Sequence, residues 1–234
     1  DRLPAELDRS QRAWEQSVHA PIAPWSLSSG LVLHKPLDDA SFDGKSFVDT
    51  GDVLRFGFLD RFTLAARIYP TAPDGAILTR AEDVPEGDGY GLYLKDGKLQ
   101  VNLVQRWLDD ALRMETADPI ALNQWHHVAM TYDGSREAYG VQIYVDGKPL
   151  KLKTNLDELN QNFTAKQPFR IGAGNGSRFQ GSIRDARAYN RALTAEELAI
   201  VAEPAAIHEI ASLERRTPAQ AEKIRLYYLE KEAP

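Results

Sequence analysis

The chain of 234 residues contains no cysteine and carries a formal net charge of −6, with a pI near 5.4. An acidic chain argues against nucleic acid as a partner, because phosphate binding requires a basic surface. The lack of cysteine excludes disulfides, thiolate nucleophiles, cysteine-ligated zinc and covalently attached haem. No apolar run approaches the length that spans a bilayer. A chain of this length can hold one all-β domain plus some helix, with a core of ordinary size, and its composition is normal for a soluble globular protein.

Residues 1–25 are expected to form a segment of their own, a short helix followed by a linker. Apolar residues recur at near-helical spacing up to Ala20, and Pro21 and the cluster at 26–30 then predict the linker. Because the chain begins with Asp1 and not with methionine, we expect it to be an excised or processed piece of a longer protein.

Residues 26–200 predict an antiparallel β domain. Short runs rich in β-branched and aromatic residues, several of them alternating with period two, are separated by turn signals that include repeated Asp-Gly pairs. About a dozen strands at this spacing are typical of a sandwich or barrel. The predicted strands cover residues 31–34, 46–49, 62–69, 76–79, 90–95, 98–106, 125–132, 141–145, 150–153, 169–173 and 179–190.

Residues 201–234 are expected to form a helical C-terminal extension. Thr194 to Glu197 and Thr217 to Gln220 both have the pattern of a capping box, in which the hydroxyl and the side chain three residues later satisfy each other's backbone amides. The helix that follows Thr217 carries too many apolar residues for a free tail. We expect it to pack on the β domain or on a partner outside this chain.

Three stretches resemble a known family. The central one is Trp125-His-His-Val-Ala-Met-Thr-Tyr-Asp-Gly134 followed by Val141-Gln-Ile-Tyr-Val-Asp-Gly-Lys148. It is similar to the laminin-G-like, concanavalin-A-like jelly roll, and so are Ser41 to Val48 and Phe179 to Thr194. The resemblance implies an all-β fold, an antiparallel β-sandwich jelly roll, here with short helical extensions at both ends. It leaves the activity open, since one fold hosts many functions.

A finer resemblance involves Gln105 to Arg113 and the tail from Arg215 to Leu229. These segments are similar to a version of the domain found inside large secreted bacterial proteins with c-type cytochrome modules and domains of unknown function. The resemblance implies an extracytoplasmic location, periplasmic or secreted. The chain has no Cys-x-x-Cys-His, so any haem module would lie outside it, and we expect no cofactor.

The resemblance also raises the question of a structural calcium ion. Many jelly rolls of this type hold one with an aspartate that follows the isoleucine of the closing strand. Here Arg184 follows Ile183, and Asp185 comes one residue later, which turns its side chain to the other face of the strand. Calcium prefers several oxygen ligands and a guanidinium would repel it. We expect no tightly held ion at this site, although the backbone at Asp43 could contribute oxygens.

Catalytic patterns are missing. His126 and His127 are neighbours on a strand and point to opposite faces, which predicts structural roles. Glycosidases on this fold present carboxylates on one strand, as Glu-x-Asp-x-x-Glu, and no such run occurs. The nearest acidic cluster, residues 82–88, reads as a solvated loop, with a second calcium site as the alternative. Without Gly-x-Ser-x-Gly or a fixed acid–base pair, the chain is not expected to be an enzyme.

A binding face is the better candidate. If Leu92 and Val101 face the core, then Tyr93, Asn102 and Arg106 face outward on two neighbouring strands. Trp107 would lie at the rim of the same surface. An aromatic ring beside amide and guanidinium donors suits the hydroxyls and ring faces of sugars, although an ordinary exposed sheet face has a similar composition.

These observations predict a non-catalytic recognition module of a larger protein, which binds a glycan or a protein partner. A structural spacer that docks on neighbouring domains is the close alternative. A glycoside hydrolase or lyase is a distant one.

Overall fold

The computed structural model describes residues 3–163 and 165–233. Clustering of the chain's own contacts divides it into two compact units. Residues Ser29–Thr194 form a β unit, and Asp1–Ser28 join Ala195–Pro234 in a helical unit. The two chain ends, which we expected as separate extensions, therefore belong to one unit.

The first sheet of the β unit has seven antiparallel strands within the described residues. Its order is β1-β16-β4-β9-β10-β11, with β2 beside β16. The strands are β1 (Leu31–Lys35), β2 (Ser41–Asp43), β4 (Phe62–Pro70), β9 (His126–Tyr132), β10 (Val141–Val145), β11 (Lys148–Pro149) and β16 (Gln180–Tyr189).

The second sheet also has seven strands in the part of the chain that the structure describes, in the order β12-β8-β7-β6-β5-β13-β3. They are β3 (Val48–Asp49), β5 (Gly75–Ala81), β6 (Gly89–Lys95), β7 (Lys98–Arg106), β8 (Asp110–Thr116), β12 (Leu152–Asp157) and β13 (Arg170–Ile171). A separate two-stranded ribbon pairs β14 (Ala173–Gly174) with β15 (Ser177–Arg178), and a 3₁₀ turn, η1 (Ala138–Gly140), precedes β10.

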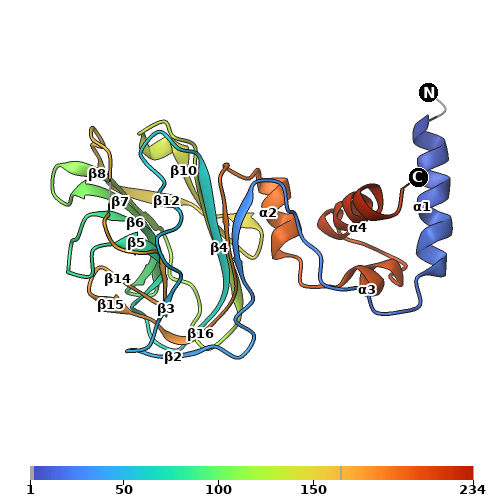
Figure 1. Ribbon diagram of the computed structural model, residues 1–234, viewed down its shortest axis with the longest axis horizontal. Helices are drawn as coiled ribbons and strands as arrows, with labels where there is room; N and C mark the ends of the chain where they lie inside the picture. The colour runs from blue at the N-terminus through green and yellow to red at the C-terminus, as the bar shows by residue number, and fades with distance from the viewer. Residues whose placement is uncertain (1–2, 164, 234) are drawn as a thin grey trace. The chain divides into compact units, whose positions relative to one another are not determined.

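The two sheets face each other across one apolar core (Figure 1). Leu64 and Val128 from the first sheet and Leu92 and Val101 from the second are completely buried in a single cluster. Burial of each such side chain stabilises the fold by about 1.5–3 kcal/mol. Because side chains alternate along a strand, this core fixes which residues of every strand point outward. The predicted antiparallel sandwich is confirmed.

Two predicted hairpin turns have the backbone that Asp-Gly favours. Asp96 and Gly97 between β6 and β7 have φ of 51° and 76°, and Asp146 and Gly147 between β10 and β11 have φ of 50° and 75°. Two successive residues with positive φ make the type I′ turn, whose twist matches that of the flanking strands. The first turn holds β6 and β7 in the register on which the candidate site depends.

The structure contains strands that were not predicted from the sequence, and one predicted strand is interrupted in the structure. β8 and β15 were not predicted. The strand expected over residues 169–173 is broken at Gly172, where φ is 87°, so the chain leaves the second sheet after β13 and enters the ribbon at β14. An L side chain at Gly172 would also collide with the ring of Phe42, at 2.5 Å.

The helical unit contains α1 (Leu3–Ser17), α2 (Ala195–Ala202), α3 (Ile207–Ala211) and α4 (Pro218–Lys231). The predicted capping box of α4 is confirmed, because the amide of Gln220 donates to Thr217 Oγ1 at 3.2 Å and the amide of Thr217 donates to Gln220 Oε1 at 3.0 Å. Ile224 of α4 packs with residues of α3, and Tyr227 stacks on Trp14 of α1. Among the described residues, no helix has the length and apolar character needed to cross a membrane.

Candidate functional site

The outer face of the second sheet gathers polar side chains from three adjacent strands. Asn102 of β7 is paired with Arg113 of β8, and Gln100 is paired with Glu115 in the same way. Tyr93 of β6 lies opposite Gln100. Paired residues of an antiparallel sheet point to the same side, so these five side chains share one surface, which we call the polar face. The alternation of core-facing and outward-facing residues along the strands predicted that Tyr93 and Asn102 lie on this surface.

The polar face is less open at its centre than predicted. Tyr93 and Asn102 are each only 5% exposed, so the expectation that they lie on an open surface was wrong. They point away from the core, as predicted, but neighbouring structure closes around them. Neither the hydroxyl of Tyr93 nor the amide of Asn102 forms a hydrogen bond with another described side chain or backbone group. Burial raises the pKa of Tyr93, so its hydroxyl remains a protonated donor well above neutral pH.

Arg113 and Trp107 form the aromatic part of the site. The guanidinium of Arg113 lies over the indole of Trp107, 4.3 Å from the ring centroid. Trp107 is half-buried at the β7–β8 turn, which agrees with its predicted place near the rim. Cation–π contact of this kind stabilises by about 0.5–1 kcal/mol at exposed sites and by more in dry ones. It holds the guanidinium of Arg113 against the face without using any of its N–H donors.

Glu115 is the acidic member of the polar face and is heavily neutralised. It receives hydrogen bonds from Asn155 at 3.0 Å and Gln100 at 3.2 Å. Lys98 and Lys153 approach the carboxylate at 3.5 and 3.4 Å. The hydrogen bond from Asn155 and then the two lysine charges hold the pKa of Glu115 below its ordinary value, against the opposing effect of burial. The carboxylate is therefore ionised and positioned, which suits hydrogen bonding to a ligand better than proton donation.

Arg106 does not join this cluster. It lies at the end of β7, its side chain is 61% exposed, and its Nε approaches Asp109 Oδ1 at 3.1 Å within the same turn. The register between β7 and β8 shifts between Val104 and Arg106, so the alternation that held for Asn102 is interrupted before it reaches Arg106. The predicted grouping of Arg106 with Tyr93 and Asn102 was therefore wrong.

The ribbon of β14 and β15 covers the neighbouring strand β5. Thr79 of β5 donates its hydroxyl to the carbonyl of Ala173 at 2.5 Å, and Arg178 of β15 holds Asp83 by two contacts of 2.8 and 2.6 Å. The ion pair of Asp83 with Arg178 therefore connects the acidic loop 82–88 to the ribbon. The polar face is thus limited to β6, β7, β8 and β12.

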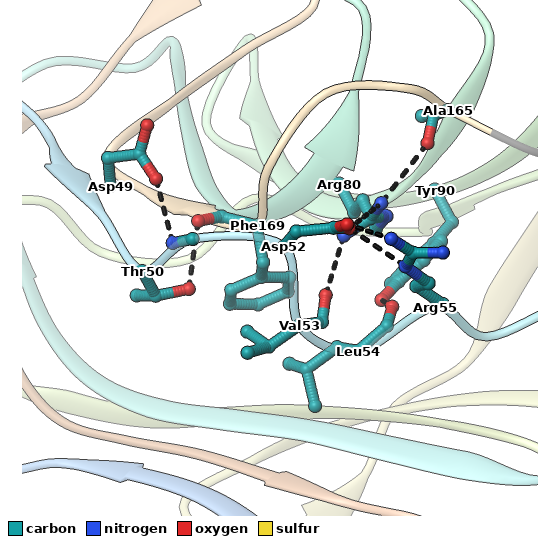
Figure 2. A network of polar contacts seen from close by, with 11 residues as sticks. Asp49, Thr50, Asp52, Val53, Leu54, Arg55, Arg80, Tyr90, Ala165 and Phe169 are labelled. Carbon is teal, nitrogen blue, oxygen red and sulfur yellow. Dashed lines mark hydrogen bonds and ion pairs between the residues drawn. The ribbon is translucent and has the colours of Figure 1, made fainter.

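A second candidate is a cleft of about 380 Å³ beside the loop that follows β3. Figure 2 shows Arg80 reaching from β5 into this loop, where it donates to the carbonyl of Val53 and to Asp52, both at 2.7 Å. Asp52 also binds Arg55, and the hydroxyl of Tyr90 donates to the carbonyl of Leu54. The donors of Arg80 and the hydroxyl of Tyr90 thus form hydrogen bonds that hold the loop against the sheet. The cleft is therefore better explained as part of the fold than as a binding site.

The position expected for a calcium ligand is occupied by a stacked cation. Arg184 lies 4.7 Å from the centroid of the Trp125 ring. Asp185 is bound by His34 at 2.7 Å and by Arg187 at 2.8 Å, so its carboxylate is already neutralised. Among the described residues, no three or more His, Asp or Glu side chains are grouped so that they could hold a metal ion.

The two adjacent histidines have different surroundings. His126 approaches Asp146 at 3.1 Å and the carbonyl of Ala121 at 3.0 Å. His127 is buried, and both of its ring nitrogens lack a hydrogen-bond partner among the described residues. Burial, together with the charge of Arg67, lowers the pKa of His127 to about 4.

The sequence reading missed Arg113 and Glu115 because it did not assign β8 as a strand. The signal was present: Leu112 and Met114 alternate with Arg113 and Glu115, and this period of two is typical of a half-buried strand. Asp109 lies in the turn before β8, and Asp110 is the first residue of the strand.

Comparison with solved structures gives matches of low identity. The CBM40 domain of a Ruminococcus gnavus IT-sialidase, bound to α2,3 sialyllactose, matches with a TM-score of 0.60 and 16% identity, over 74% of this chain and 100% of that chain. The binding domain of Paraclostridial Mosquitocidal Protein 1 matches with a TM-score of 0.50 and 17% identity, over 76% and 46%. A Trypanosoma rangeli sialidase matches with a TM-score of 0.50 and 16% identity, over 85% and 38%.

At these identities the matches establish the fold alone. No curated protein matches the chain. Residues 42–199 match the family described as the concanavalin A-like lectin/glucanases superfamily, in its laminin-G form. The match covers most of the β unit, including both sheets and the polar face. The chain therefore belongs to the laminin-G-like branch of the concanavalin A-like lectin and glucanase superfamily.

Proposed function

We propose that this protein is a non-catalytic recognition module that binds a glycan on the polar face. The observation that carries the proposal is that Tyr93, Asn102 and Arg113 present hydrogen-bonding groups that no described residue satisfies. Unsatisfied polar groups that are largely buried cost about 1–3 kcal/mol each, and a bound ligand that pairs with them recovers this cost. Sugar hydroxyls supply both donors and acceptors for such groups.

The half-buried ring of Trp107 adds an apolar surface for the face of a sugar ring. The CBM40 domain of the Ruminococcus gnavus IT-sialidase, which has a similar fold, is bound to α2,3 sialyllactose, and this supports a glycan as the ligand. The proposal includes an extracytoplasmic location, periplasmic or secreted, because a protein in that location has access to extracellular glycans.

The absence of catalysis belongs to the proposal for a chemical reason. Glycoside hydrolysis needs one carboxylic acid with a raised pKa and a second carboxylate across the bound sugar. On the polar face the carboxyl group is that of Glu115, whose pKa is lowered. A carboxylate of this kind orients a ligand and is a poor general acid.

The test is binding of the 234-residue protein to a broad glycan array, followed by calorimetry on each hit. Binding that is lost in Asn102→Ala and Trp107→Ala, both shown to be folded, supports the proposal. The absence of any hit, or hits that survive both changes, overturns it. The absence of any hit would favour the alternative role as a structural spacer or docking domain.

A further inference from the structure

We infer that the glycan bound on the polar face carries an oxyanion, a carboxylate or a sulfate, and that Arg113 receives it. The inference rests on the proposed glycan-binding function and names the class of glycan. It begins from the hydrogen-bonding state of Arg113. A guanidinium has five N–H donors and is always charged. In the part of the chain that the structure describes, Arg113 forms no hydrogen bond and no ion pair, and its Nε is enclosed with no partner.

Arg80 and Arg178 of the β unit differ from Arg113, because their guanidinium groups are paired with acceptors of the protein. Arg80 binds three acceptors, two of them carbonyls and one the carboxylate of Asp52. Arg178 holds Asp83 with two of its nitrogens. Arg113 is instead kept in place by Trp107, and the N–H donors of its two terminal nitrogens, which are not enclosed as Nε is, stay available to a molecule from outside.

The charge of the surroundings favours an anion. Arg113, Lys98 and Lys153 contribute three positive charges to this surface, and Glu115 contributes one negative charge. The chain as a whole has a net charge of −6, so this basic patch differs from the overall charge of the protein. A local excess of positive charge raises the concentration of anionic ligands and increases their rate of association.

The geometry suits an oxyanion that presents two oxygens side by side, as both a carboxylate and a sulfate do. A guanidinium binds carboxylate or sulfate oxygens through two parallel N–H donors, with specificity for direction. Asn102 lies directly across from Arg113 in the register, with Cβ atoms about 4.5–5.5 Å apart. Its free amide can bind a third oxygen or an adjacent hydroxyl. Tyr93, on the next strand, can donate to the sugar that carries the acidic group.

The experiment uses ligands that share one neutral core: lactose, 3′-sialyllactose and 3′-sulfolactose. A second pair consists of a galacturonate tetrasaccharide and its methyl ester. Each is titrated by calorimetry into the wild-type protein, Arg113→Met, Arg113→Lys and the control Arg61→Ala. Arg61 is an exposed arginine of the β unit with no hydrogen bond or ion pair to any described residue. Circular dichroism confirms that each variant is folded.

We expect at least one anionic ligand to bind tenfold or more tightly than its neutral counterpart. Arg113→Met should abolish this preference, Arg113→Lys should retain only part of it, and Arg61→Ala should leave it unchanged. Raising NaCl from 50 to 500 mM should weaken binding of the anionic ligand alone. Comparison of the sialyl and sulfo forms tells whether a carboxylate or a sulfate is recognised.

Equal affinity for the neutral and anionic members of both sets, or a preference that survives Arg113→Met, would overturn the inference. So would array hits confined to neutral glycans, and in that case the proposed function would still stand. A complete absence of glycan binding would instead defeat the proposed function, and the inference with it.

Discussion

The guanidinium of Arg113 lies over the indole of Trp107, 4.3 Å from the ring centroid, and has no hydrogen-bond or ion-pair partner among the described residues. The contact fixes a long cationic side chain on the polar face, and it leaves the two terminal nitrogens of the guanidinium without a partner among the described residues. This relationship determines what the polar face can recognise. It also implies that the two residues contribute to binding together.

Trp107→Ala is expected to weaken glycan binding tenfold or more while the free energy of unfolding changes by about 1 kcal/mol or less. The ring is half-buried, so its removal loses ligand contact worth about 25 cal/mol for each Å² and releases Arg113. Calorimetry and urea denaturation on the same sample measure both quantities. The control is Arg106→Ala, an exposed residue paired with Asp109, which should change neither. A loss of about 3–5 kcal/mol of stability would instead identify Trp107 as a core residue.

Tyr93→Phe removes a hydroxyl that has no hydrogen-bond partner among the residues that the structure describes. Stability should therefore stay within about 0.5 kcal/mol of the wild type. Affinity should fall about 3- to 10-fold, the equivalent of about 0.5–1.5 kcal/mol for a lost hydrogen bond. Tyr139→Phe is the matched control, because Tyr139 is 74% exposed on η1. Unchanged affinity in Tyr93→Phe would show that the ligand does not reach this hydroxyl.

Arg80→Met should destabilise the fold and leave ligand binding intact. The change leaves the carbonyls of Val53 and Ala165 without their donor, and each lost contact to a charged group costs about 1.5–3 kcal/mol. We expect a decrease of roughly 2–4 kcal/mol in the free energy of unfolding. Arg55→Ala, at an exposed position of the same loop, should stay within about 0.5 kcal/mol. A binding defect in a folded Arg80→Met protein would mean that the cleft in Figure 2 takes part in recognition.

His127 should make the protein less stable in acid. Its pKa is about 4 in the folded state, against an ordinary value of 6.5, so the unfolded chain binds the extra proton first. The stability contributed by the neutral histidine is complete above about pH 6.5 and is lost as the pH falls towards 4, by up to about 3 kcal/mol.

His127→Phe tests this dependence, because both ring nitrogens lack partners and the substitution removes the titrating group while an aromatic ring stays at this position. The variant should be at least as stable as the wild type at pH 7, and its melting temperature should fall less between pH 6.5 and pH 4.5. Identical pH profiles for the two proteins would contradict the prediction.

Chelation by EDTA is expected to change the melting temperature by less than about 1 °C. A cation bound only to the folded state at a hundredfold excess over its dissociation constant would stabilise by about 2.7 kcal/mol, which a melting curve detects readily. Arg184, stacked on Trp125, occupies the position where related jelly rolls place a ligand. Arg184→Asp, with and without added calcium, is the complementary experiment. A large drop on chelation of the wild-type protein would reveal a site elsewhere.

Much of the architecture could be predicted from local pattern. The alternation in β6, β7 and β10 and the Asp-Gly turns that follow β6 and β10 specified hairpins, because these features depend on residues close together in the sequence. The capping box at Thr217 is local in the same way and was confirmed. The direction in which Tyr93 and Asn102 point followed from the same alternation.

What local pattern could not determine was how open the polar face is and which side chains share it. The burial of Tyr93 and Asn102 depends on structure around them, and the partner of Asn102 depends on the register with β8. Arg113 and Trp107 meet because a turn and a strand position them together, a contact between residues six positions apart that no helical or strand period predicts. The sequence alone thus determined the sandwich and the outward direction of its residues. Only the tertiary structure decided which donors remain unpaired, because pairing depends on every group that the fold brings within hydrogen-bonding distance.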